Sequence, residues 1–349
     1  MTTRLRSFRR RSALTGLAGI LTMAVLAACS GGGGQGDDQT TPPASTTTST
    51  TAAGGPTSID DVAQGPQPPK KGVWVGAWVK PDEMSQAGRT AAVTGFESAL
   101  GRPLDIVHIY HDFDEEMPTE SDKTFADNGA TILLSWAGAD TRSIQQGTYD
   151  DVIKKQAAAL KGWDAKILLE WRWEMDRLNL QSQIWSAQDY IAAWKHIRAI
   201  FAAEGATNVG WVWCPLAVGF DTNRSQPFYP GDDQVDWVCA DVYPGNTIKP
   251  FETGAASFLN WAKDHPKPII IGEFGIKQAR GEETQEQWLN EVKAYVPTVP
   301  QIKALVYFNA DNSEQEKKPY NMSLLSSPTA LAAFKSLAAD PYFDVYRKK

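Results

Sequence analysis

The stretch Pro268-Ile269-Ile270-Ile271-Gly272-Glu273-Phe274 decides the fold class of this chain. A short, continuous apolar run predicts a strand that is buried on both faces, as in a parallel sheet. Seven further apolar runs of similar length occur along the sequence, with amphipathic stretches between most of them. The predicted strands are Val73–Val79, Asp105–Phe113, Ala130–Ala137, Lys166–Glu174, Val209–Pro215, Val235–Tyr243, Pro268–Phe274 and Ile302–Asn309.

Helical periodicity between these strands is clearest over Ala187–Ala203, where Tyr190, Trp194 and Ile197 share one face. Eight alternations of strand and helix predict the α/β class and a closed (β/α)8 TIM barrel. The 278 residues from 72 to 349 fit the roughly 250 residues typical of that fold. The alternative is an open doubly wound sheet. Its usual glycine-rich nucleotide turn is missing after the first predicted strand.

The N-terminal region has the features of an export signal followed by a tether. Residues 1–28 combine an arginine-rich start with a short apolar run and small residues, which predicts a secretory signal peptide. Leu26-Ala27-Ala28-Cys29 resembles a bacterial lipobox, so we expect Cys29 to be lipidated. The Gly-, Ser-, Thr- and Pro-rich residues 29–71 then form a flexible linker. The domain at 72–349 is therefore expected outside the cytoplasm, held to the cell membrane through its lipid alone.

Charge and composition exclude several classes of protein. The chain has 34 basic and 41 acidic residues, a net charge of −7. Removal of the five arginines in residues 1–28 would leave 29 basic residues and a net charge of −12. Nucleic acid is therefore not an expected partner. The histidines show no zinc-binding spacing, so we expect no metal and no cofactor. Separately, we expect a monomer. The histidines are His108, His111, His196 and His265.

The two cysteines of the domain, Cys214 and Cys239, are too few for a disulfide scaffold. If Trp213 and Tyr243 both point into the barrel mouth, strand alternation places the two cysteines on opposite sides. The sequence then favours free thiols, whereas a β-bulge in one of the strands would reverse this arrangement.

The candidate site lies at the carboxyl ends of the strands, where TIM barrels carry their chemistry. Acidic residues and tryptophans dominate there, and indoles with carboxylates and amides suit sugars. Tryptophans beside helices, including Trp185, are expected to be packing residues. The candidate catalytic residues are Glu174 and Glu273. The candidate substrate-binding residues are Trp78, His111, Asp112, Trp136, Arg172, Trp173, Trp213, Asp241, Tyr243 and Asn309.

Two glutamates at strand ends suggest cleavage of a glycosidic bond. Glu273 ends an apolar strand between two glycines, where an unpaired carboxylate would cost several kcal/mol. One glutamate would protonate the leaving oxygen while the other attacks the anomeric carbon. Tyr243 is placed to hydrogen-bond the nucleophile.

Alternation along the fourth predicted strand places Glu170, Arg172 and Glu174 on one face and Trp171 and Trp173 on the other. For Glu170 and Arg172 we favour a structural ion pair that seals the barrel. Glu174, at the end of the strand, is favoured as functional.

Several stretches together resemble glycoside hydrolase family 26, which comprises β-mannanases and related β-glucanases and β-1,3-xylanases. They are residues 190–201, 208–215, 228–232, 235–238, 241–243, 270–275 and 306–309. The resemblance implies a retaining β-glycan hydrolase, similar to an endo-β-mannanase, with Glu174 as acid/base and Glu273 as nucleophile. It also implies that Tyr243 hydrogen-bonds the nucleophile and that Trp136 and Trp213 are sugar platforms.

The fourth strand departs from the family pattern. Members often read Arg-x-x-His-Glu-Met-Asn-Gly, whereas this chain has Glu170, Trp173, Asp176 and Arg177 at the Arg, His, Asn and Gly positions. The acid is retained, but the sugar-binding surroundings differ, so mannan itself is not implied. Arg172 is expected to keep the ionic network in reversed order. The alternatives are a surface lipoprotein that binds glycan without cutting it and a two-lobed solute-binding lipoprotein.

Overall fold

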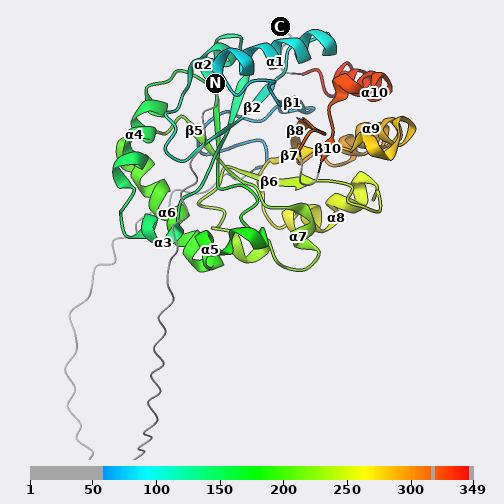
Figure 1. Cartoon of the computed structure of the whole chain (residues 1–349). Coiled ribbons are helices and arrows are strands. Elements are labelled where there is room, and N and C mark those ends of the chain that lie inside the picture. Colours follow the sequence, from blue (N-terminus) through cyan, green and yellow to red (C-terminus); the bar gives the residue numbers. More distant parts are fainter. Residues whose placement is uncertain (1–57, 316–318, 346–349) are drawn as a thin grey trace, which may run out of the picture. The chain divides into compact units, whose positions relative to one another are not determined.

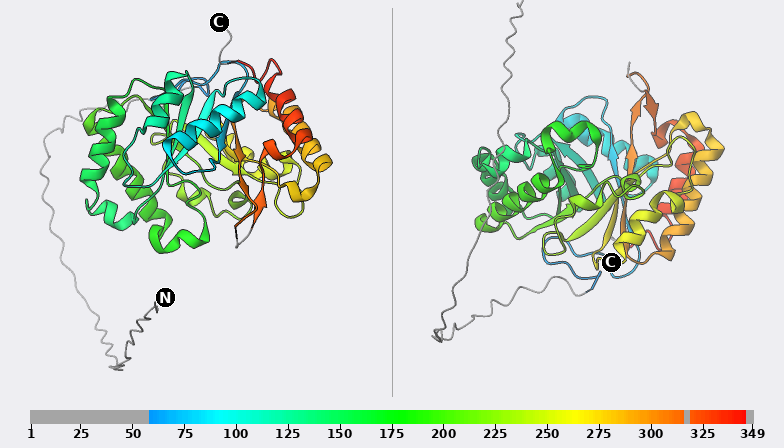
Figure 2. Two further views of the ribbon diagram at one scale, coloured as in Figure 1. Left: turned by 45° about the horizontal axis from the view of Figure 1, so that its top comes forward. Right: turned by 90° about the horizontal axis from the view of Figure 1, so that it is seen from below.

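The computed structural model describes residues 58–315 and 319–345. Its parallel strands form one closed barrel in the order β1 to β8, with helices around it (Figures 1 and 2). This confirms the predicted (β/α)8 barrel. The barrel strands are β1 Trp74–Val79, β2 Ile106–His111, β3 Thr131–Trp136, β4 Ile167–Trp171, β5 Val209–Trp213, β6 Trp237–Val242, β7 Ile269–Phe274 and β8 Ile302–Asn309.

The helices pack their apolar faces on the outside of the barrel. In α6 (Ala187–Glu204), Tyr190, Ala193, Trp194, Ile197 and Phe201 are buried at the predicted helical spacing. The other helices are α1 Gln86–Leu100, α2 Glu120–Asp127, α3 Thr141–Gln145, α4 Asp150–Lys161, α5 Gln181–Ile184, α7 Ala217–Phe220, α8 Phe251–Ala262, α9 Glu282–Tyr295 and α10 Pro328–Ala338. A small antiparallel pair, β9 (Asp311–Asn312) and β10 (Tyr320–Asn321), follows β8.

The ordered domain begins before residue 72, the predicted start of the domain, because residues 62–65 already pack on the barrel. Val62 is buried in the same cluster as interior strand residues, and the Gln64 backbone N–H donates to Asp236. At Gly65 a Cβ would lie 2.2 Å from the backbone nitrogen of Gly210, so only glycine allows this contact. The predicted signal peptide, Cys29 and the linker as far as residue 57 lie outside the described residues.

The barrel interior is filled by apolar residues contributed by all eight strands. Each strand supplies at least one member of this cluster, so the centre of the barrel is packed and is not a channel. The members on the strands are Trp74, Ile106, Leu133, Leu168, Val212, Trp237, Cys239, Ile270, Ala304 and Val306.

A disulfide joins Cys214 and Cys239, so the prediction of free thiols was wrong. Trp213 points outward, against the rings of Phe220 and Trp261, and Cys214 therefore points into the barrel. The pairing of β5 with β6 brings the cysteines opposite each other, with their Cα atoms 4.3 Å apart.

Gly272 in β7 leaves room for this disulfide. A Cβ at residue 272 would lie 2.5 Å from Cys239 Sγ and 2.8 Å from Cys214 Sγ. Such contacts are too short for real atoms, so the strand that carries Glu273 requires glycine beside the disulfide.

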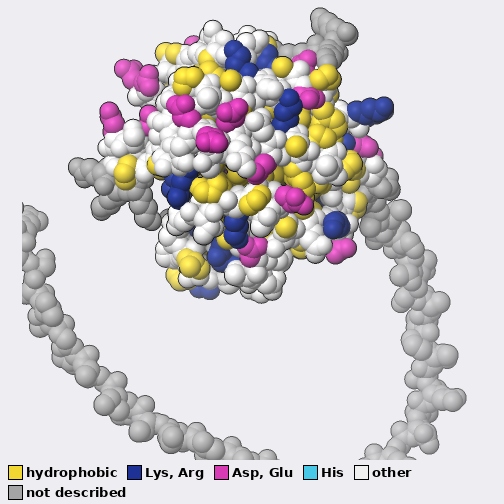
Figure 3. All heavy atoms as spheres, turned by 90° about the vertical axis from the view of Figure 1, so that its right-hand side faces the viewer, with side chains coloured by type: hydrophobic (Ala, Val, Ile, Leu, Met, Phe, Trp, Pro, Cys, Tyr) yellow, Lys and Arg dark blue, Asp and Glu magenta, His cyan; other side chains and the backbone are white. Residues whose placement is uncertain are grey.

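None of the helices in the described part of the chain has both the length and the apolar character needed to cross a bilayer. On the face that carries α9 and α10, acidic and basic side chains are interspersed among apolar ones (Figure 3).

Candidate active site

Three buried carboxyl groups meet at the carboxyl end of the barrel. They belong to Glu174, just beyond β4, Asp241 in β6 and Glu273 in β7. One carboxylate oxygen from each lies within 4.8 Å of the others. The structure therefore brings together the two predicted catalytic glutamates and one predicted substrate-binding residue.

Glu174 is positioned by an irregular backbone rather than by the strand. β4 ends at Trp171, and both Arg172 (φ 55) and Glu174 (φ 48) adopt left-handed backbone angles. Such angles cost side-chain-bearing residues on the order of 1–3 kcal/mol each. The Glu174 N–H donates to Cys214 O at 2.7 Å, which fixes the turn. The predicted alternation through residue 174 was wrong for this reason, and Trp173 lies on the mouth side.

Glu273 is held by two phenol hydroxyls. An irregularity in β7 pairing between Ile271 and Phe274 lets Glu273 point toward the mouth. Tyr243 OH donates to Glu273 Oε2 at 2.5 Å, and Tyr110 OH donates to Oε1. The position of Tyr243 agrees with its predicted contact, while Tyr110 was not among the predicted residues.

Burial raises the pKa of all three carboxyl groups. For Glu174 the pKa rises to about 8, because burial and the neighbouring Glu273 outweigh the charge of Arg177. Burial also raises the pKa of Glu273, although the hydrogen bonds from Tyr110 and Tyr243 oppose the rise. Burial, together with the nearby carboxyl groups of Glu273 and Glu174, raises the pKa of Asp241 well above its ordinary value. Such a cluster can hold a protonated and an ionised carboxyl group side by side at neutral pH.

Below this cluster lies a polar layer that contains Glu170. Its carboxyl group accepts from the Ser135 hydroxyl and lies 3.7 Å from His108 Nε2. Burial raises the pKa of Glu170 to about 8, against the hydrogen bond from Ser135, and lowers the pKa of His108 to about 3. Both groups are therefore neutral near pH 7.

Arg172 does not pair with Glu170, so the predicted ionic network was wrong. Its guanidinium donates to Gly138 O at 3.1 Å and to the Gln183 side chain. Gly138 makes room for it, because a Cβ there would lie 2.3 Å from Arg172 Cδ. Arg172 thus ties the loops after β3 and β4 together.

Aromatic rings line the mouth beside Glu273. Trp78 stacks on Phe308 with centroids 4.6 Å apart and meets Tyr110 edge-on at 5.4 Å. The ring of Trp173 lies 4.9 Å from that of Tyr110. Trp78 and Trp173 were predicted to bind substrate, and both are partly exposed here.

His111 and Asp112 lie apart from the cluster. His111 is buried on the outer side of β2, with its two ring nitrogens 3.1 Å from Glu115 and Asp122. Burial alone would lower its pKa, but hydrogen bonds to these carboxylates prevail and raise the pKa of His111 to about 9. Asp112 is exposed. His111 therefore links β2 to α2 through Asp122.

Trp136, Trp213 and Asn309 also lie outside the carboxyl cluster. Both tryptophans are fully buried on the outer side of the barrel, where Trp136 stacks on Phe113. Asn309 is buried and accepts from the Leu324 N–H, which fixes the segment after β10. On β3, β5 and β8, the strand face opposite these residues points into the barrel, as the interior positions of Leu133, Val212 and Val306 show.

The residues missed by the sequence reasoning are His108, Tyr110, Ser135 and Phe308. On β2, Ile106, His108 and Tyr110 share one face by alternation. The apolar-to-polar gradient along that face, toward the strand end, was the signal that could have found Tyr110.

Trp185 was expected to be a packing residue but is half exposed. Its indole N–H donates to Asp140 Oδ2 at 2.6 Å, and the guanidinium of Arg142 lies 4.5 Å from the ring centroid. Its left-handed backbone (φ 63) is a further constraint on its position.

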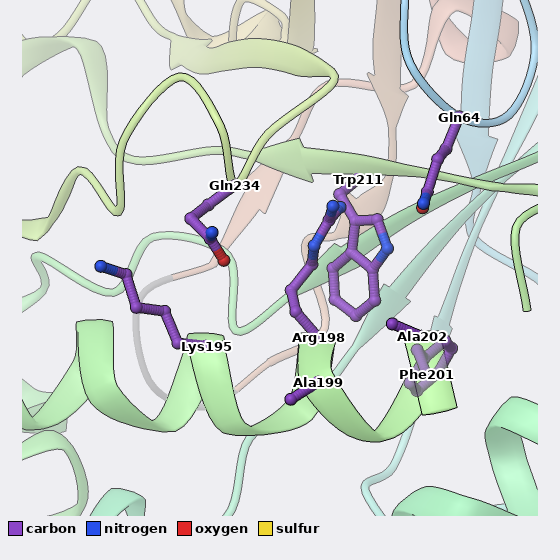
Figure 4. A pocket seen from close by; sticks show the side chains of 8 residues that line it. All are labelled: Gln64, Lys195, Arg198, Ala199, Phe201, Ala202, Trp211 and Gln234. Carbon is purple, nitrogen blue, oxygen red and sulfur yellow. The ribbon is translucent and has the colours of Figure 1, made fainter. Parts of the chain in front are cut away.

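Two of the cavities among the described residues lie at contrasting places. One of about 300 Å³ lies between α6 and the barrel, toward the amino ends of the strands (Figure 4). Its Arg198 lies over the ring of Trp211 and 3.6 Å from Asp236, so the guanidinium already pairs with groups of the protein itself. The second, of about 250 Å³, is lined by Tyr243, whose hydroxyl donates to Glu273.

The fold and the carboxyl cluster define a class, that of TIM-barrel proteins resembling β-glycan hydrolases, and comparisons with known proteins agree. No family model matches the chain. Endoglucanase H of Acetivibrio thermocellus is 29% identical over 287 residues, covering 76% of this chain and 30% of that protein. The β-1,3-xylanase TXYA of a Vibrio species is 24% identical over 221 residues, covering 55% and 46%. The chain thus spans less than half the length of these relatives.

Solved structures of family 26 proteins share this fold. GH26C from a Muricauda species superposes with a TM-score of 0.61 at 15% identity, covering 80% of this chain and 88% of that one. A GH26 β-mannanase from Bacteroides ovatus gives 0.59 at 16% identity, covering 80% and 94%. The predicted resemblance to family 26 is confirmed at the level of the fold.

Proposed function

We propose that this protein is a retaining β-glycan hydrolase. The observation that carries the proposal is the close approach of the Glu174 and Glu273 carboxylates, within 4.8 Å at the barrel mouth. Retaining glycosidases need carboxyl groups about 5–5.5 Å apart, whereas inverting ones need about 6.5–9.5 Å. The separation in this protein is shorter than the spacing with which inverting enzymes accommodate a water molecule.

In the first step, protonated Glu174 gives its proton to the glycosidic oxygen while the Glu273 carboxylate attacks the anomeric carbon. The bond to the leaving sugar breaks, and a glycosyl ester on Glu273 forms. In the second step, Glu174 takes a proton from water, which attacks the same carbon and releases Glu273. Tyr110 and Tyr243 stabilise the Glu273 carboxylate before the attack and after its release.

The substrate proposal is a β-linked polysaccharide of the mannan, glucan or xylan type. It is supported by the partly exposed indoles of Trp78 and Trp173, both of which contact the ring of Tyr110, because indoles suit sugar rings. The names of the sequence relatives point to the same class of substrate.

The test is incubation of the domain with β-mannan, mixed-linkage β-glucan, β-1,3-xylan and cell-envelope glycans, with NMR detection of the first anomer. The expected result is β-anomer release that disappears in Glu273→Ala. Initial release of the α-anomer would contradict the retaining mechanism. Glycan binding without new reducing ends would favour the non-catalytic binder.

The location proposed for the protein is the outer face of the cell membrane, with Cys29 lipidated. The lipobox-like Leu26-Ala27-Ala28-Cys29 supports it. The test is fractionation of cells that carry the native chain or Cys29→Ala. The variant is expected to lose the membrane association, and an unchanged distribution would contradict lipidation at Cys29.

A further inference from the structure

Arg177 is a charged residue at the mouth that the proposed hydrolysis does not use. It lies just before the short turn Leu178–Leu180, three residues beyond Glu174. Its Nη1 atom lies 2.6 Å from Glu174 Oε2, and its side chain is 48% exposed. Its charge also opposes the burial-driven rise in the pKa of Glu273 and of Tyr320. The guanidinium therefore lies at the entrance to the carboxyl cluster.

The contact between Arg177 and Glu174 opposes the role of an acid. A guanidinium in contact with a carboxyl group favours the ionised form, whereas the first step needs the protonated form. Arginine has five N–H donors in a planar fork that matches an oxyanion in bidentate fashion. With its side chain half exposed, Arg177 is accessible to an anion arriving from solvent.

Two further cations lie near the mouth, in the cavity that Tyr243 lines. The cavity beside Tyr243 is lined by Lys277 and Arg280, and the described residues that line it include no carboxylate. Lys277 Nζ lies 6.0 Å from the ring centroid of Tyr320, the tyrosine whose pKa also responds to Arg177. Basic groups thus gather at this mouth although the chain has a net charge of −7.

We propose that the site is specific for an anionic β-glycan, with Arg177 as the residue that binds the anionic group. The proposal rests on the proposed function and names its substrate class. An oxyanion on the sugar, either a carboxylate or a sulfate ester, takes the Arg177 guanidinium away from Glu174. Glu174, left without its cation in a buried site, then holds the proton needed for the leaving oxygen. Lys277 and Arg280 attract neighbouring charges of the same polymer.

The test uses β-glucan, β-mannan and β-1,3-xylan, each in neutral, carboxymethylated and sulfated form at matched low substitution. For the polymer that is cleaved, kcat/KM is expected to be about tenfold or more higher for an anionic form, as for a charge-assisted hydrogen bond. The preference should fall as salt is added. The carboxymethyl and sulfate arms show which oxyanion fits.

The variants are Arg177→Gln, Arg177→Lys and Lys155→Gln. Arg177→Gln is expected to bring the anionic-to-neutral ratio of kcat/KM close to one, and Arg177→Lys to keep part of the preference. Lys155, an exposed cation of α4 paired with Glu116, is the matched surface control and should leave the ratio unchanged. Equal use of neutral and anionic forms by the native protein would overturn the proposal. A loss of rate in Arg177→Gln that is the same on both forms would also overturn it, since Arg177 would then act on Glu174 alone.

If no polymer is cleaved, the hydrolase proposal fails, and affinity electrophoresis in the same polymers tests recognition by itself. Retardation by an anionic form that Arg177→Gln abolishes would support anion recognition. Migration unaffected by the anionic polymers would overturn it.

Discussion

The two glutamates of the mouth are equally buried but are held in opposite ways. Glu174 lies on left-handed backbone beyond the end of β4, and its carboxyl group contacts the long, half-exposed side chain of Arg177. Glu273 lies within β7, and its two oxygens accept from the hydroxyls of Tyr110 and Tyr243. Hydrogen-bond donors fixed on the barrel favour a permanent carboxylate, whereas a group without them can exchange its proton. The difference supports the proposed roles, with Glu273 as the nucleophile and Glu174 as the acid/base.

The largest expected effect comes from removing each carboxyl group in turn. Glu273→Ala should lower kcat on polysaccharide by a factor of about 10⁴ or more. Glu174→Ala should also lose activity on polysaccharide, but it should still react with an aryl glycoside, whose leaving group needs no proton. Steady-state rates on both substrates check this, with Glu170→Gln as the matched buried control.

Azide sharpens the same comparison. In Glu174→Ala, azide should replace the water of the second step and give a product of retained configuration. In Glu273→Ala, it should occupy the space of the nucleophile and give the inverted product. The opposite pattern by NMR would exchange the two assignments.

The disulfide lies next to both glutamates, so its removal should not distinguish them. The double variant Cys214→Ala/Cys239→Ala opens a link with a sequence separation of 25 residues. It should lower the free energy of unfolding by about 3 kcal/mol. Denaturant unfolding measures the loss, and the native protein with reductant is the control. An unchanged midpoint in both would contradict a stabilising disulfide.

The tyrosine hydroxyls should affect Glu273 alone. Tyr110→Phe and Tyr243→Phe should each lower kcat/KM by roughly 10- to 100-fold, the range for one hydrogen bond to a charged group. Loss of a donor raises the pKa of Glu273, which must be ionised to attack. The acidic limb of the pH profile should therefore move to higher pH. Tyr307→Phe is the control, because its hydroxyl donates to Met322 O and not to a carboxylate. Equal effects of all three changes would deny Tyr110 and Tyr243 a specific role.

The smallest expected effect concerns the alkaline limb of the pH profile. Glu174 must be protonated, so kcat/KM should fall as the pH rises through about 8. Its carboxyl group faces Glu273, Asp176 and Arg177, of which Arg177 alone favours ionisation. Arg177→Gln should therefore move the alkaline limb upward, by less than about one pH unit. Rates measured across the pH range check the direction, and a downward shift would contradict the assignment of Glu174.

The eight strands could be predicted because each is a short apolar run, and closure of the barrel follows from their number. Glu273 and Tyr243 could be placed at the mouth because Glu273 lies near the carboxyl end of β7 and Tyr243 directly follows β6. The inward face of a strand was harder to predict. On β2 both faces carry polar or aromatic residues, so alternation alone did not favour Tyr110 over His111.

The end of β4 shows a different limit. Trp173 and Glu174 both reach the mouth because the chain leaves extended geometry at Arg172, and nothing in the residue types there requires left-handed angles. The prediction of free thiols was wrong because it assumed that Trp213 points into the barrel mouth. Trp213 points outward, so the next residue, Cys214, points inward and can reach Cys239.

The disulfide between β5 and β6 has a practical consequence for any preparation of this protein. Disulfides persist where the surroundings are oxidising and are reduced in most cytosols. A sample made inside an ordinary bacterial cytosol would therefore contain chains that have the barrel sequence but lack one covalent link beneath Glu273. Mass spectrometry of the intact chain, before any kinetic comparison, would separate a change caused by a variant from one caused by incomplete oxidation.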